Sequence, residues 1–231
     1  MLIRRMGLAV LVLAGWGFAA QAAEPEAAPA DAPPNEARGY VGIGLVATSH
    51  TSETLLGDLD SGGGGVAVNG VGHSGKINPS LDIAFRGEGA ILGREFDGGG
   101  EVADVLFEVD GGLRISELLL LTLGYTTHGT AYENPQVATT YNVVPIGIGL
   151  LHTTDTGYFL AQLRLGGGRL GNDQNDDTEG VGYVGLRAAM QRGSADGVQF
   201  MVAVALDTYE VDDLGITDQF FRLDFGLGFG L

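Results

Sequence analysis

The sequence has no cysteine and only one lysine, Lys76, and it carries 12 basic against 29 acidic residues, a net charge of −17. Without cysteine there is no disulfide framework, no thiolate metal site and no cysteine nucleophile. So acidic a chain also lacks the basic surface on which nucleic acid or phosphate groups bind. We therefore expect no nucleic-acid partner.

The first 22 residues have the pattern of a secretory signal peptide. Arg4 and Arg5 precede an uncharged, mostly apolar stretch from Met6 to Ala20, and Ala20 and Ala22 place small residues before a cut at Ala23. An uncleaved membrane anchor is the alternative, but the apolar stretch is short for a spanning helix. We predict cleavage, which leaves ten basic and 29 acidic residues, a net charge of −19.

Residues 23–38 read AEPEAAPADAPPNEAR and contain four prolines but no apolar pattern. Such a composition is typical of a stiff, disordered tether. We predict a periplasmic linker over 23–38, followed by a single domain over 39–231.

Long apolar runs are also absent after residue 23. Instead, apolar residues alternate with polar, charged or glycine residues. In the last eleven residues, every second side chain is apolar and the others are charged or glycine. Successive side chains of a strand point to opposite faces, so this segment is predicted to be a strand with one wholly apolar face. That face consists of Phe221, Leu223, Phe225, Leu227, Phe229 and Leu231.

The same alternation recurs along the chain and fits either a soluble sheet or a membrane barrel. Predicted strands of about 11–13 residues favour the barrel, because soluble strands average about 5–6 residues. Tyrosines at predicted strand ends favour it too, since aromatic girdles line membrane interfaces. These tyrosines are Tyr40, Tyr125, Tyr141, Tyr158, Tyr183 and Tyr209.

The segment FFRLDFGLGFGL resembles the terminal strand of Gram-negative outer-membrane β-barrel proteins, although that family usually ends on phenylalanine and here Leu231 is last. The resemblance covers residues 39–231. In size, the predicted barrel is nearest to the small OmpA/OmpX-type barrels. The resemblance implies an outer-membrane location, recognition of the terminal strand by the barrel-assembly machinery, and contact with outer-membrane lipid and lipopolysaccharide. We expect an all-β, single antiparallel transmembrane up-and-down barrel, a monomer of ten strands, with eight as the alternative.

An even number of strands is expected, because both ends of a bacterial barrel lie in the periplasm. The longer connections are then outer loops, at 49–62, 93–100, 128–138, 170–178 and 210–218. The predicted strands are 39–48, 63–72, 80–92, 101–115, 117–127, 139–152, 157–169, 179–192, 197–209 and 219–231.

The inward-facing positions collect a balanced set of charges near mid-strand. A narrow interior favours such balance, because an unpaired buried charge is costly and arginine pairs well with carboxylates. The predicted lumen network is Arg86, Glu88, Glu108, Asp110, Arg164, Arg187, Arg222 and Asp224. It could lock a closed barrel, or it could separate charge across a narrow pore, with space left by inward glycines such as Gly147 and Gly228.

No catalytic, cofactor or metal site emerges from the sequence. All four histidines fall in predicted loops or at strand ends, and His50-Thr51-Ser52 only resembles the His-x-Ser pair of outer-membrane lipid A deacylases. Omptin-type proteases also have ten strands, but their His-Asp segment is absent.

The G-x-G-x-x-G run at 166–171 precedes an acidic loop rather than a helix. That loop, 173–179, has Asp173, Asn175 and Asp177 at calcium-loop spacing without the later ligands, which leaves loose divalent-cation binding open.

The function expected from these patterns is that of a non-enzymatic small outer-membrane barrel with a structural, envelope-integrity or surface-interaction role. A narrow pore for small polar solutes is the first alternative, and a lipid A-modifying hydrolase is the second. Fold class alone does not decide between them.

Overall fold

The computed structural model describes residues 37–54, 57–78, 81–97, 99–115, 118–132, 137–172, 175–194 and 197–231. The predicted signal peptide and nearly all of the predicted linker lie outside these residues. Ten strands and one short 3₁₀ helix, η1 (Asp212–Leu214), follow one another along the chain. The strands are β1 (Arg38–Thr54), β2 (Gly57–Asn78), β3 (Leu81–Phe96), β4 (Glu101–Arg114), β5 (Leu119–Tyr132), β6 (Val137–Thr154), β7 (Gly157–Asn172), β8 (Asn175–Gly193), β9 (Gln199–Val211) and β10 (Ile216–Gly230).

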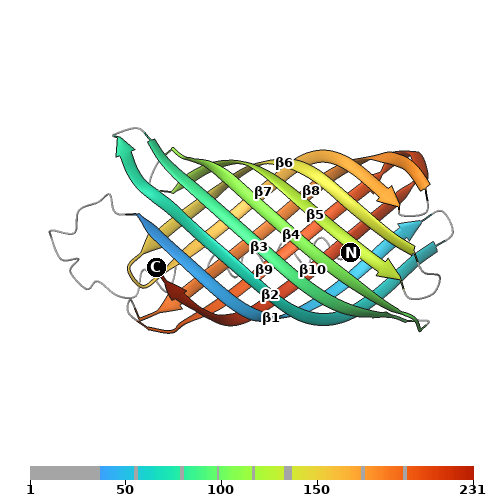
Figure 1. The fold of residues 1–231 in the computed structure, drawn as a ribbon, viewed down its shortest axis with the longest axis horizontal. Helices are drawn as coiled ribbons and strands as arrows, with labels where there is room; N and C mark the ends of the chain where they lie inside the picture. The colour runs from blue at the N-terminus through green and yellow to red at the C-terminus, as the bar shows by residue number, and fades with distance from the viewer. Residues whose placement is uncertain are drawn as a thin grey trace.

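The strands form one closed antiparallel barrel in which each strand pairs with its neighbours in sequence (Figure 1). β1 pairs with β10 to close the ring, from Tyr40 opposite Gly230 to Glu53 opposite Thr217. The predicted all-β, up-and-down barrel of ten strands is therefore confirmed over the eight-stranded alternative. The chain enters β1 and leaves β10 at the same end, called the terminus end below, and the opposite end is called the outer end.

Most strands run further toward the outer end than the alternation predicts. β1 continues to Thr54 and β2 begins at Gly57, so much of the predicted outer loop 49–62 is strand. The run Gly62–Gly65 keeps full register with Val46–Ser49, because backbone pairing does not require alternating side chains. The predicted loops 128–138 and 170–178 are shortened in the same way.

The outer wall is apolar. Many large aliphatic and aromatic side chains are exposed on it, some of them by more than half, and they come from strands all around the barrel. Water would not favour so large an apolar surface, whereas the hydrocarbon of a bilayer does. Examples are Ile43, Leu45, Ile91, Leu123, Ile146 and Phe200. No helix in the described part of the chain is long and apolar enough to cross a membrane.

The predicted tyrosine girdle is wrong for five of its six members. Tyr125 is 41% exposed on the outer wall, but the other five tyrosines are buried inside the barrel. Two of the buried hydroxyls reach carboxylates: Tyr183 donates to Asp207 at 2.6 Å and Tyr141 donates to Asp218. The hydroxyl of the fully buried Tyr209 has no hydrogen-bond partner, so these side chains point inward because of their parity in the strands and not because each hydroxyl finds a partner there.

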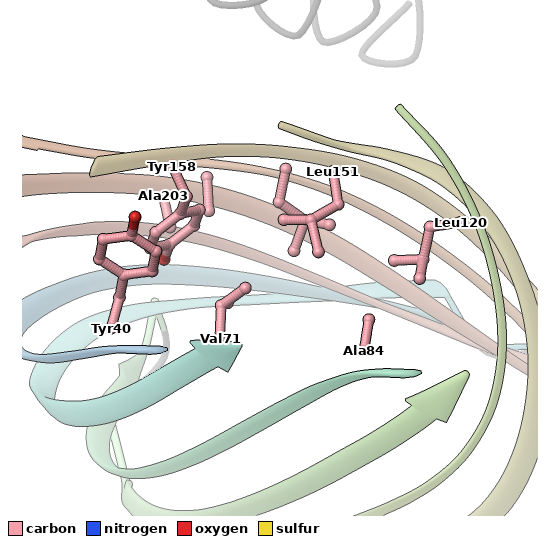
Figure 2. Close-up of a cluster of buried hydrophobic side chains, with 9 residues drawn as sticks. Tyr40, Val71, Ala84, Leu120, Leu151, Tyr158 and Ala203 are labelled. Carbon is pink, nitrogen blue, oxygen red and sulfur yellow. The ribbon is translucent and has the colours of Figure 1, made fainter. Parts of the chain in front are cut away.

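Apolar side chains fill the interior near both ends. At the terminus end, Tyr40 and Tyr158 pack at 5.3 Å between ring centroids, and side chains from facing strands point into the same space (Figure 2). Near the outer end, Tyr141 stacks on Tyr209 at 4.4 Å beside Phe220. The charged residues predicted for the lumen lie between these two apolar layers.

Candidate functional site

The interior between the apolar layers is built from the side chains predicted for the lumen. All eight are at most 7% exposed. They come from strands on different sides of the ring, since β3 and β4 contribute four of them and β7, β8 and β10 contribute the others. The strand positions are Arg86 and Glu88 in β3, Glu108 and Asp110 in β4, Arg164 in β7, Arg187 in β8, and Arg222 and Asp224 in β10.

Glu108 is the centre of this cluster and is fully buried. Its Oε2 atom lies 2.5 Å from Nη2 of Arg86 and 3.2 Å from Nη1 of Arg164. Arg187 donates to both carboxylate oxygens, and its Nη2 lies 3.1 Å from Oε1. Nη2 of Arg222 is 3.5 Å from Oε1. One carboxylate thus joins four guanidinium groups from four strands.

Further ion pairs extend the cluster. Arg86 donates to Asp110 at 2.7 Å and to Glu88 at 2.8 Å, and Arg164 donates to Asp110 at 3.1 Å. Arg222 donates to Glu88. Each arginine therefore meets at least two carboxylates, an arrangement in which the planar guanidinium can use several of its donors.

Asp207 of β9 belongs to the cluster, although the sequence did not single it out. Its Oδ2 atom accepts from Nη2 of Arg222 at 3.1 Å and lies 3.9 Å from Nη2 of Arg187. Asp224, which was predicted in the network, is 3% exposed, but none of the ion pairs found among the described residues involves it and its Oδ1 atom has no hydrogen-bond partner. Asp207 has inward parity in the predicted strand 197–209, and this parity could have identified it as a lumen residue from the sequence.

Opposite charges meet across the lumen instead of staying on separate walls. Glu108 and Asp110 come from β4, whereas Arg164 and Arg187 come from β7 and β8, and they are in direct contact. The separation of charge across an open lumen, on which the pore interpretation depended, is therefore wrong for these residues. At these distances between buried groups, the pairs compensate one another's desolvation.

The inward glycines do not leave the space that the pore interpretation requires. A Cβ atom at Gly147 would lie 2.3 Å from Oγ1 of Thr122, and one at Gly228 would lie 2.4 Å from Nε2 of Gln191. Neighbouring side chains thus occupy the room beside them. A cavity bounded by Arg86, Asp110 and the apolar layer measures about 10 Å³, which is room for about one water molecule.

Two contacts bridge the barrel mouth at the terminus end. Arg38, at the start of β1, lies 2.5 Å from Asp155 in the turn between β6 and β7. Tyr40 donates to the carbonyl of Thr154 in the same region. Because β1 and β6 lie on opposite sides of the ring, these contacts bridge the mouth above the apolar layer.

Three histidines predicted in loops lie in strands and face the interior. His50 is in β1, His73 in β2 and His128 in β5, and each is at most 6% exposed. They were misplaced because the strands extend beyond the alternating segments. His50 Nε2 lies 3.1 Å from Asp218 and its Nδ1 lies 3.4 Å from Oγ of Ser61.

This Ser61–His50–Asp218 chain has the residue types of a hydrolase triad, although no sequence motif links these three residues. Ser61 also accepts a hydrogen bond from Arg94, which in turn pairs with Asp104. The polar groups therefore satisfy one another in a buried position, as buried polar groups usually do. In the described ranges, no group of three or more histidine or acidic side chains is placed to hold a metal ion.

The remaining predicted sites divide between the outer wall and residues that the structure does not describe. In β10, Phe225, Leu227 and Phe229 are about half exposed on the outer wall, and Leu231 is exposed beyond the strand. Phe221 and Leu223 have the same parity and are partly covered. The side chains of the predicted calcium-like loop, from Asp173 to Thr178, lie outside the described residues, so loose cation binding stays a prediction.

No protein-family model and no curated protein sequence matches the chain. Among solved structures, the outer membrane protease OmpT of Escherichia coli aligns with 10% identity over 86% of this chain and 97% of its own, with a TM-score of 0.48. The COG4313 outer membrane channel of Pseudomonas putida F1 aligns with 10% identity over 90% of this chain and 100% of its own, with a TM-score of 0.42. Ail of Yersinia pestis aligns with 12% identity over 84% of this chain and 99% of its own, with a TM-score of 0.34. These likenesses assign no activity to this chain.

Proposed function

We propose that this protein is an outer-membrane barrel that neither conducts solutes nor catalyses a reaction, and that serves the envelope as a rigid, closed structural element with an interactive outer end. The central contact network around Glu108 supports this proposal most directly. Four arginines and four carboxylates meet there, and a path through the barrel would have to separate them. Separating such buried pairs costs several kcal/mol for each unpaired charge.

The apolar outer wall and the closed ring support placement in a membrane, and the secretory N-terminus supports the outer membrane of a Gram-negative cell. In this proposal the terminus end faces the periplasm and the outer end faces the cell exterior. The outward side chains of β10 then present the assembly signal, and the outer wall contacts lipid and lipopolysaccharide. The barrel acts as a monomer.

Liposome swelling tests the closed barrel. The refolded chain is reconstituted into liposomes, which are then diluted into an isotonic solution of a small neutral sugar. The proposal predicts swelling no faster than for protein-free liposomes, while heat-modifiable gel migration shows that the barrel is folded. Fast swelling by folded protein would instead support the pore and refute the proposal.

A further inference from the structure

The outer end of the barrel carries a groove that the closed interior does not explain. It has a volume of about 520 Å³, within the range of about 300–1,000 Å³ that small-molecule sites occupy. Its walls come from the first residues of β2, the end of β3 with the turn that follows, and the end of β5. The lining residues are Asp58, Leu59, Asp60, Phe96, Asp97, Gly99 and Tyr132.

The apolar floor of the groove is held in place by buried hydrogen bonds beneath it. Leu59, Phe96 and Tyr132 each lie two residues nearer the outer end than Ser61, Arg94 and Thr130, respectively. The side chain of Asp104, on β4, accepts from Arg94 at 2.9 Å and from Thr130 at 2.7 Å, and Arg94 also donates to Ser61. Because these polar residues tie β2, β3, β4 and β5 together, the groove is formed before a ligand arrives.

Two aromatic rings form one wall. The rings of Phe96 and Tyr132 are nearly parallel, at 6°, with centroids 6.3 Å apart. The face of an aromatic ring carries negative electrostatic potential and attracts a cation within about 6 Å of its centroid. The alkyl part of a ligand would also find apolar contact here and on Leu59.

Three carboxylates lie along the same groove, and none of its lining residues is basic. Asp60 is fixed by a hydrogen bond of 2.7 Å from Oγ1 of Thr51, and its carbonyl accepts from the amide of Asp97 at 3.3 Å. The latter bond joins the β2 side of the groove to the turn after β3. In a chain of strongly negative charge, a concave acidic surface concentrates cations.

We propose that this groove binds a polyamine, an alkyl chain that carries two or three ammonium groups. The ammonium groups would contact Asp58, Asp60 and Asp97, and the alkyl segments would lie on Leu59, Phe96 and Tyr132. An inorganic cation would use the carboxylates but not the apolar wall, whereas a polyamine uses both. The proposal deepens the interactive outer end proposed above, and it rests on that end facing the exterior.

Isothermal titration of the refolded chain in detergent with spermidine tests the site. We expect saturable binding of one spermidine per chain, weaker at high salt because salt screens exposed charges. Asp97→Asn removes one carboxylate, and Phe96→Leu keeps an apolar side chain but removes the ring face. Each is expected to weaken binding about threefold, and the double variant about tenfold.

The matched control is Asp213→Asn, the same change at an exposed position of η1 at the same end but outside the groove. Its affinity for spermidine should stay within about 1.5-fold of the wild type. Equal weakening by Asp213→Asn and Asp97→Asn would overturn the proposal, because binding would then follow overall charge. Absence of saturable binding, or full displacement by an equal concentration of Ca²⁺, would overturn it as well. Liposome swelling is read separately, so a leaky barrel would refute the closed interior without deciding this site.

Discussion

The substitution Glu108→Gln tests whether the charge cluster holds the barrel together. Glu108 is fully buried and contacts four arginines, so removing its charge leaves their guanidinium groups to share fewer carboxylates. The glutamine amide also brings two donors into a place where the four arginines already supply donors. Breaking a buried ion pair by neutralising one partner costs about 3–5 kcal/mol. We expect a loss of that size in the free energy of unfolding.

The assay is reversible urea unfolding in lipid vesicles, followed by far-ultraviolet circular dichroism and by the gel shift between folded and unfolded barrel. Glu101→Gln is the matched control, because Glu101 begins the same strand but is exposed. Its loss should stay within about 0.5 kcal/mol. The double variant Glu108→Gln with Arg187→Gln should recover part of the lost stability, since it removes one of the unbalanced cations.

A loss for Glu108→Gln no larger than for Glu101→Gln would show that the charge cluster does not stabilise the barrel. It would mean that the arginines find water or other partners inside the barrel, and that the interior is wetter than the contacts indicate. A recovery of zero in the double variant would show that the loss does not come from unbalanced charge.

Three further predictions concern the seam, the triad-like chain and the terminal strand. Gly226→Ala should destabilise the β1–β10 seam by about 1–3 kcal/mol, because the added Cβ would lie 2.2 Å from the carbonyl oxygen of Ile43. Gly93→Ala is the control, because a Cβ at Gly93 would meet no atom within 4 Å. Equal urea midpoints for the two variants would contradict the prediction. A fluorophosphonate probe should leave Ser61 unlabelled in intact-mass spectra, whereas labelling lost in Ser61→Ala would show an activated nucleophile. Phe229→Ser should reduce folded barrel in outer-membrane fractions more than Phe200→Ser, an outward change in β9; equal reductions would argue against a terminal assembly signal.

Strand number and the two faces of the wall follow from period two alone, because a strand alternates its side chains whatever its partners are. The ends of the strands do not follow from it. The Gly62–Gly65 run has no alternation, yet it pairs in full register with β1. His50 and His128 lie beyond the alternating segments for the same reason, yet both are in strands and face the interior.

Partners inside the barrel depend on register and closure, which a single strand does not encode. Asp207 and Asp224 both have inward parity, but only Asp207 is brought within 3.1 Å of Arg222 by the pairing of β9 with β10. The tyrosines show a second limit. Tyr183 and Arg187 have the same parity in β8, so the inward direction of Tyr183 can be predicted from the sequence. The aromatic girdle typical of membrane barrels instead predicts that Tyr183 points outward.

Planar-bilayer conductance of the refolded chain tests the closed interior most directly, because single ions pass through openings too narrow for sugars. A closed interior should leave the bilayer silent at moderate voltage when gel migration shows folded barrel, with brief openings only when Glu108→Gln loosens the cluster. Discrete, reproducible channel steps from the wild-type chain, altered in size or ion preference by Arg187→Ala, would contradict it.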